Sequence, residues 1–226
     1  MRKSGFFSAK RITGMAVLLA LVIVLQLFGS YIKIGATPLS FILVPIVLGG
    51  VLYGPIAGGL LGFAFGFIVF MQGVSGVDGF TAILIQDHPI YTALLCMGKG
   101  VAAGVVPALV YRWLAKKNEY VAVISAALCA PIVNTGLFVL GALAFLQDTL
   151  QANFTDGTSV LYFLIIVCAG VNFLVEFAIN LVASPSIYRV INIITGRKNV
   201  KIDIKEDENI APCDGQAKKT EDVVEQ

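Results

Sequence analysis

The chain has very little charge for its length. Of its 226 residues, 13% are charged and 58% are hydrophobic, whereas a soluble domain carries about 25% charged residues. No Asp, Glu, Lys, Arg or His occurs in residues 34–77 or in residues 120–147. Both stretches exceed the roughly 20 apolar residues that a helix needs to cross a bilayer. The scarcity of charge therefore excludes an ordinary soluble domain and predicts a protein embedded in a membrane.

The chain also lacks the residue sets on which most enzymes rely. It has one histidine, and its four cysteines show neither metal-ligand nor redox spacing. The stretch MGKG around Lys99 is not a phosphate-binding loop, because Ala93 and Gly100 stand where that loop needs Gly and then Ser or Thr. We therefore expect no enzyme activity, no metal, no cofactor and no nucleic-acid partner.

What the chain does contain is a series of six apolar stretches. The second and third are separated only by Gly54, where the letters YGP favour a break because Gly is permissive and Pro starts a helix well. We predict an all-α membrane protein with a cytoplasmic N-terminus (1–11), a six-helix transmembrane domain (12–195) and a disordered cytoplasmic tail (196–226). The predicted transmembrane helices are Ile12–Tyr31, Leu39–Tyr53, Pro55–Gln72, Pro89–Trp113, Tyr120–Phe145 and Val160–Tyr188.

Positive charges predict the orientation of these helices. Four Lys and Arg residues precede the first helix, three lie between the fourth and fifth, and seven occur from Arg189 onward. Of the 16 in the chain, the remaining two are Lys33 and Lys99. Because cytoplasmic loops are enriched in Lys and Arg, both termini of this multi-pass protein are predicted on the cytoplasmic side of the cell membrane.

The last apolar stretch carries polar residues on one face. Its segment VNFLVEFAINLV contains Asn172, Glu176 and Asn180, and residues four apart stand nearly above one another on a helix. A charge in the bilayer costs at least about 2.5–3.5 kcal/mol, and such residues usually mark function. Glu176 therefore needs an explanation beyond helix packing.

Two other predicted helices carry polar residues at the same depth. Glu176 and Lys99 each lie 13 residues before the Arg that ends their helix, which places both about 20 Å from the cytoplasmic edge. Asn134 and Thr135 on the fifth helix and Asn172 on the sixth reach a similar level. The core is about 30 Å thick, so all five residues are expected in its outer half.

This level admits two interpretations. In the first, Lys99 and Glu176 only neutralise each other, or they form the proton switch of a self-sufficient secondary transporter or channel. In the second, the residues form a polar pocket for a water-soluble ligand from outside, since Asn offers both a donor and an acceptor. The letters QDHP indicate a helix start with Pro in the first turn, and His88 there is a further candidate for ligand contact.

Several stretches together resemble a known family. They are RITGMAVLLALVIVLQ, YIKIGATPLSFILVPIVLGGVLYGPIAGGLLG, APIVNTGLF and VNFLVEFAINLVASP. In this order they resemble the substrate-binding S component of energy-coupling factor (ECF) vitamin transporters, over about residues 11 to 190. The resemblance rests on several weak motifs in sequence rather than on one diagnostic signature.

The resemblance implies partners and further site residues. S components bind a vitamin-like molecule near the outer face and associate with a transmembrane T subunit and two cytoplasmic ATPases. The family's first helix docks the T subunit through small residues at an Ala-x-x-x-Ala spacing, which Ala16 and Ala20 fit. The loop between the first two helices covers the ligand in the family, and this implies a role for Lys33.

The resemblance also bears on the identity of the vitamin. Riboflavin-binding members carry an Asn in each of the last two helices, matching Asn134 and Asn172, but a Lys follows the second Asn by three residues. Here that position is Val175. The departure argues against riboflavin, so pantothenate is our first candidate, with riboflavin and other water-soluble vitamins or precursors left open.

Overall fold

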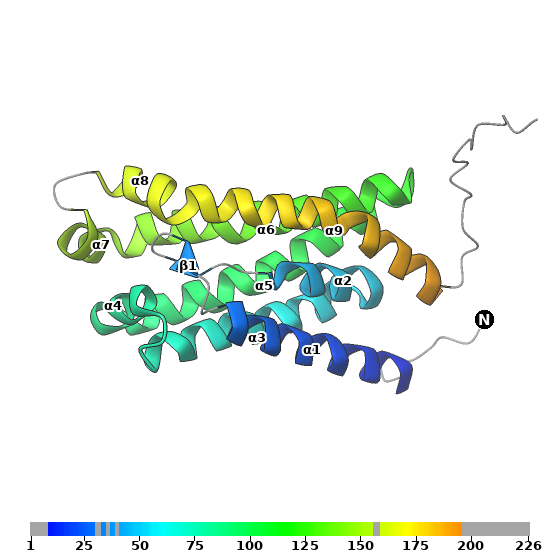
Figure 1. The fold of residues 1–226 in the computed structure, drawn as a ribbon, viewed down its shortest axis with the longest axis horizontal. Helices are drawn as coiled ribbons and strands as arrows, with labels where there is room; N and C mark the ends of the chain where they lie inside the picture. Colours follow the sequence, from blue (N-terminus) through cyan, green and yellow to red (C-terminus); the bar gives the residue numbers. More distant parts are fainter. Residues whose placement is uncertain (1–8, 30–32, 35–36, 39–40, 156–158, 196–226) are drawn as a thin grey trace, which may run out of the picture.

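The structure is a computed structural model that describes residues 9–29, 33–34, 37–38, 41–155 and 159–195. In these residues the chain forms an elongated helical bundle (Figure 1). Two-residue strands β1 (Lys33–Ile34) and β2 (Thr37–Pro38) pair antiparallel before the second helix. The helices are α1 (Ala9–Gly29), α2 (Leu43–Tyr53), α3 (Pro55–Val74), α4 (Gly79–Asp87), α5 (Pro89–Leu114), α6 (Glu119–Phe145), α7 (Gln147–Phe154), α8 (Val160–Tyr162), the π-helix η1 (Phe163–Gly170) and α9 (Val171–Thr195).

Five helical segments in the described part of the chain are long and apolar enough to cross a membrane. They are α1, α3, α5, α6 and the joined segment of α8, η1 and α9. Large apolar side chains such as Leu140 and Val182 point outward from them, 65% and 77% exposed. Lipid tails would cover such a surface, so the predicted helical membrane protein is confirmed.

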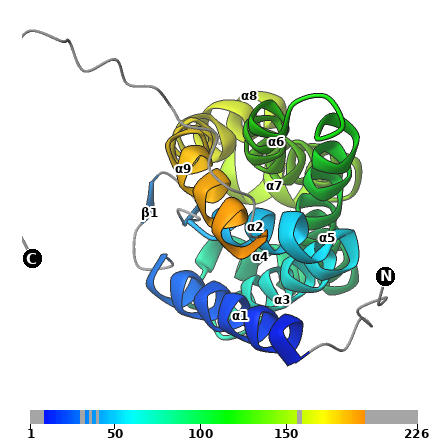
Figure 2. The ribbon, with the colours of Figure 1, turned by 90° about the vertical axis from the view of Figure 1, so that its right-hand side faces the viewer.

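The second predicted span differs from the expectation. α2 begins at Leu43 rather than Leu39, and its 11 residues extend only about 16 Å, roughly half the apolar core. Six full-length spans are therefore not found among the described residues. α2 packs against α1, α3, α5, α6 and α9, and Figure 2 shows it in the middle of the bundle. Because protein surrounds it, α2 does not have to be as long as the bilayer is thick.

The predicted break between α2 and α3 lies at Gly54. This residue has a φ of +101°, in the left-handed region where side chains with a Cβ are strained. Pro55 then occupies the first turn of α3, where its missing N–H has no helical partner to lose. Arg11 of α1 donates a hydrogen bond from Nη2 to the Tyr53 carbonyl at 3.1 Å, so α1 is tied to the end of α2.

Helices α3 and α5 pack backbone against backbone. Gly58 and Gly62 of α3 face Gly100 and Gly104 of α5. A Cβ built on Gly62 would lie 2.0 Å from the Gly100 carbonyl oxygen, and one on Gly104 would lie 1.9 Å from the Gly58 oxygen. At these four glycines no side chain fits between the two helices. The four-residue glycine spacing of α3 therefore serves close helix packing.

Two short helices, α4 and α7, close the end of the bundle opposite the start of α1 (Figure 1). Both lie in stretches for which we predicted no transmembrane helix, and nine and eight residues are too few for a span. Phe80 and Leu84 of α4 share a buried cluster with Leu146 and Leu150. The Phe80 and Phe154 rings lie 5.0 Å apart, a favourable aromatic contact. These short helices therefore cover the buried core at this end of the bundle.

Helix α9 continues through Pro185 because a side chain replaces the missing helical donor. Proline has no N–H, so the Leu181 carbonyl four residues earlier loses its usual partner. The Ser184 hydroxyl donates to this oxygen at 2.7 Å, and Ser184 is 1% exposed. The Ser-Pro pair thus keeps a buried carbonyl hydrogen-bonded.

We expect Ser184→Ala to lower the free energy of unfolding by about 0.5–1.5 kcal/mol, because the Leu181 carbonyl loses its donor. Pro185→Ala restores a backbone N–H at this point, so Ser184→Ala should have almost no effect in that background. Unfolding of the four proteins in detergent forms a double-mutant cycle. Equal destabilisation by Ser184→Ala in both backgrounds would contradict this assignment.

Candidate functional site

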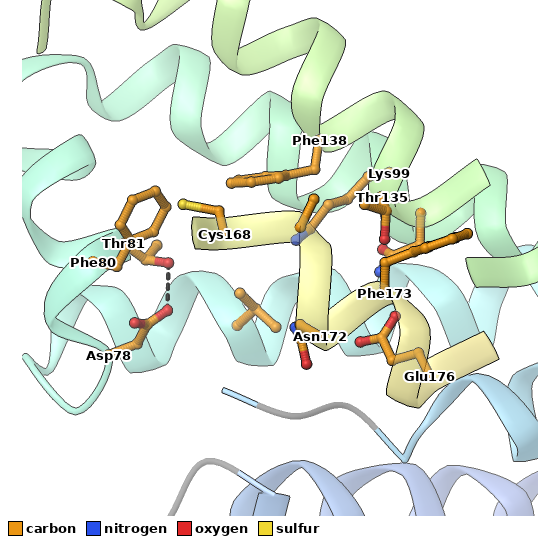
Figure 3. A pocket seen from close by; sticks show the side chains of 13 residues that line it. Asp78, Phe80, Thr81, Lys99, Thr135, Phe138, Cys168, Asn172, Phe173 and Glu176 are labelled. Atoms are coloured by element: carbon orange, nitrogen blue, oxygen red, sulfur yellow. Dashed lines mark hydrogen bonds between the residues drawn. The ribbon is translucent and has the colours of Figure 1, made fainter. Parts of the chain in front are cut away.

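A cavity lies in the half of the bundle that α4 closes (Figure 3). The space inside it measures about 570 Å³, part of which is open to the outside. Side chains from α3, α4, α5, α6, η1 and α9 surround it. The lining residues are Val69, Asp78, Phe80, Thr81, Lys99, Asn134, Thr135, Phe138, Cys168, Ala169, Asn172, Phe173 and Glu176.

The cavity brings together the five polar residues that the depth argument places at one level. Lys99 comes from α5, Asn134 and Thr135 from α6, and Asn172 and Glu176 from α9. Glu176 is only 2% exposed and Asn134 6%. Convergent polar groups in an otherwise apolar cavity are typical of a ligand site. Their role in binding stays a prediction, but their meeting in one cavity is a structural finding.

The last helical segment lines the cavity because its polar residues recur every fourth position. Cys168 of η1 and Asn172 and Glu176 of α9 line the cavity wall. The same face continues below the cavity through Asn180 and Ser184, each 1% exposed. The Asn180 Nδ2 donates to the Glu176 main-chain oxygen at 2.8 Å. The π-helical turns of η1 adjoin the site, as such turns often do in other proteins.

Asn134 enters the cavity from α6, three residues after Pro131. The helix runs without a break from Glu119 to Phe145, so Pro131 does not interrupt it. The Asn134 Oδ1 is buried and accepts no hydrogen bond within the described residues. An unsatisfied buried acceptor costs about 1–3 kcal/mol. A ligand group that donates to Asn134 would remove this penalty.

Lys99 contacts an aromatic ring inside the cavity. Its Nζ lies 4.9 Å from the centroid of the Phe138 ring, within the range of a cation–π contact. Figure 3 shows the ammonium group beside that ring. Lys99 and Glu176 line the same cavity, from α5 and α9, and both interpretations of these residues stay predictions.

Asp78 and Thr81 are cavity residues that the sequence did not reveal. They are 5% and 6% exposed, and the Thr81 hydroxyl donates a short hydrogen bond to the Asp78 carboxylate (Figure 3). Phe80 and Phe138 add aromatic walls. In the sequence, Asp78 is an Asp just before a short apolar stretch. That pattern is equally typical of an ordinary helix cap, so it does not indicate a cavity residue.

Two other residues, His88 and Lys33, were predicted to contact the ligand. His88 lies at the start of α5 with Pro89 following, as predicted, but its side chain makes no capping hydrogen bond. It packs edge-on against Tyr91 at 6.0 Å and is not among the residues lining the cavity. The Lys33 side chain lies outside the described residues, as does the predicted tail 196–226.

Comparison with known protein families identifies the kind of protein that contains this cavity. A family model described as "ECF transporter, substrate-specific component" matches residues 10–188. That range contains every residue that lines the cavity. The chain belongs to the substrate-specific components of ECF transporters. No curated protein matches the chain significantly.

As an ECF substrate-specific component, the protein is a multi-pass membrane subunit that binds a substrate for a transporter rather than an enzyme. The family resemblance stated from the sequence motifs is confirmed. Membership implies a small-molecule substrate and association with the T and ATPase subunits of an ECF complex.

The surface predicted to dock the T subunit lies on α1. Ala16 and Ala20 are exposed, while Leu18 and Val22 pack into the bundle, at 7% and 0% exposure. The two alanines are one helical turn apart and face away from the protein. Their docking role stays a prediction.

Proposed function

We propose that this ECF component captures a water-soluble vitamin or precursor, with pantothenate the first candidate, in the cavity of Lys99, Asn134, Asn172 and Glu176. The observation that carries the proposal is a buried polar cavity in a helical bundle that otherwise presents apolar surface. Intramembrane polar groups are retained where they act on a ligand or an ion. The T subunit and two ATPases of the complex would then supply the energy for uptake.

The direction of capture follows from the positive charges. The start of α1, the turn between α5 and α6, and the end of α9 lie at one end of the bundle (Figure 1). This end carries Arg11, Arg112, Lys116, Lys117 and Arg189, and such an end faces the cytoplasm by the positive-inside rule. We infer that both termini are cytoplasmic and that the cavity, in the other half, receives its ligand from outside the cell.

Native mass spectrometry of the purified protein tests the proposal directly. A bound small molecule of vitamin size is the expected result, and it should be displaced by an excess of the same compound. Uptake by vesicles that contain this protein alone, driven by a proton gradient, would instead support a self-sufficient secondary transporter. ATP-driven uptake that requires the T and ATPase subunits supports the proposed function.

Asn172→Ala and Glu176→Gln should weaken ligand binding without unfolding the protein. Loss of a neutral hydrogen bond lowers affinity by about 2- to 10-fold, and loss of a charged one by roughly 10-fold or more. We expect titration calorimetry with the identified ligand to show these changes. Asn192→Ala is a matched control, because Asn192 is a buried Asn of α9 outside the cavity.

Two outcomes would contradict the pocket assignment. One is unchanged affinity in both cavity variants. The other is an equal loss of affinity in Asn192→Ala, which would indicate a general disturbance of α9. Thermal unfolding of each variant separates loss of a contact from loss of the fold.

A further inference from the structure

Asp78 occupies a capping position but does not cap its helix. It precedes α4 with extended backbone angles of φ −101° and ψ 96°, and its side chain accepts no capping hydrogen bond from a backbone N–H of the first turn. An Asp at this position usually accepts an N–H from the second or third helical residue, which stabilises the helix. Here the carboxylate accepts the Thr81 hydroxyl and lines the cavity. Its orientation thus favours the cavity over the helix.

Two acidic side chains and one basic side chain line the cavity. Figure 3 shows Asp78 and Glu176 at opposite ends of the row of lining side chains. Lys99 belongs to the same lining, and its ammonium contacts the Phe138 ring, whereas the Asp78 carboxylate accepts the Thr81 hydroxyl. Buried charges are normally paired with each other, because each is expensive to remove from water. Asp78 is 5% exposed and lines the cavity together with Lys99. Both groups can therefore bind a third partner inside the cavity.

We propose that this third partner is a ligand that carries two unlike groups. One is a carboxylate or a comparable acceptor, which Lys99 binds, and the other is a set of hydroxyl or amine donors, which Asp78 binds. Asp78, held by Thr81, is then a residue that determines specificity at the end of the cavity near α4. This inference rests on the proposed function, and it adds the chemical class of the ligand and a recognition residue that the sequence motifs do not indicate.

The aromatic residues of the cavity support a ligand with two unlike polar groups. Phe80 and Phe138 line the same cavity as these polar groups, and their rings are 6.0 Å apart. Apolar surface of this kind excludes water from the charged groups and strengthens their contacts with a ligand. A molecule with an apolar middle and polar groups at separate positions therefore fits the lining better than a uniformly charged one.

A pair of probes that differ in one group tests the proposal. Pantothenate and panthenol share their hydroxyl and amide groups, but panthenol has an alcohol in place of the carboxylate. We would measure both affinities by titration calorimetry on the full-length protein in detergent. Wild type should prefer pantothenate by roughly tenfold or more, because a charge-assisted hydrogen bond is lost in panthenol.

Single variants then separate the two halves of the site. Lys99→Met should remove the preference by weakening pantothenate and leave panthenol within about threefold. Asp78→Asn should weaken both probes by roughly tenfold, since both keep the same hydroxyl donors. Asp78→Ser serves as a second variant if Asp78→Asn does not fold. Thermal unfolding monitors the fold of each.

The outcomes are distinct. Retention of the preference in Lys99→Met, or wild-type affinity for both probes in a folded Asp78 variant, overturns the inference. If wild type binds neither probe, native mass spectrometry identifies the molecule it retains. A retained molecule with both an acceptor group and hydroxyl or amine donors supports the inference, and one that lacks either overturns it. Absence of any bound molecule contradicts the proposed function itself.

Discussion

Gly62→Ala is expected to destabilise the protein more than any other single methyl addition discussed here. The new Cβ would lie 2.0 Å from the Gly100 carbonyl oxygen, and a backbone atom of a packed helix cannot rotate away as a side chain can. Overpacking of this kind costs about 1–3 kcal/mol or more, a large part of the 5–15 kcal/mol that stabilises a typical protein. We expect a much lower unfolding temperature in detergent and a poor yield of monodisperse protein.

Gly98→Ala is the matched control for this prediction. Gly98 lies on α5, two residues before Gly100, and a Cβ there meets nothing within 4 Å. Alanine is favoured over glycine in a helix by up to about 1 kcal/mol, so this variant should be as stable as wild type or more so. If Gly62→Ala unfolded at the same temperature as Gly98→Ala, the backbone contact between α3 and α5 would be wrong.

The second large effect is expected on the assembly of the transporter. Ala16→Trp and Ala20→Trp should abolish co-purification with the T and ATPase subunits and ATP-driven uptake, while ligand binding by the isolated protein persists. Association between helices in lipid depends on close contact, and an indole group would hold a partner helix away. Both alanines are exposed on α1, so the substitutions are made on the surface of the bundle and not in its core.

Ala178→Trp is the corresponding control. Ala178 is also an exposed alanine, but it lies on α9. The same substitution there should leave assembly and uptake intact. Normal assembly of both α1 variants would exclude the docking surface. Loss of ligand binding in them would instead place the two alanines within the internal packing of the protein.

The sequence located the polar level of the cavity because helix geometry converts position into depth. Each residue advances a helix by 1.5 Å, so distances from the charged residues at the predicted cytoplasmic helix ends suffice to align Lys99, Asn134 and Glu176. These end residues are Arg112, Glu119 and Arg189. The same reasoning could not reveal Asp78. Whether an Asp before a helix caps it or turns into a cavity depends on tertiary contacts, and the letters are the same in both cases.

The lengths of the elements were harder to predict than their order. Composition identifies an apolar stretch, but it does not distinguish a short helix inside a bundle from a span across lipid. The expected helix from Leu39 therefore began before the observed start of α2 at Leu43, and the short helices α4 and α7 were not predicted. Gly54 was predictable because a local backbone requirement, the left-handed φ, coincides with a Gly-Pro pair.

The shortness of α2 has a consequence for biosynthesis. Eleven residues fall below the roughly 17 needed for a segment to settle across a bilayer by itself. Since Gly54 alone joins α2 to α3, we expect the two to enter the membrane together as a helical hairpin, with the 20 apolar residues of α3 as its stable arm. The final position of α2 would then be reached only when α5, α6 and α9 have been synthesised and have gathered around it. The topology of the amino-terminal half would in this way depend on helices that leave the ribosome later.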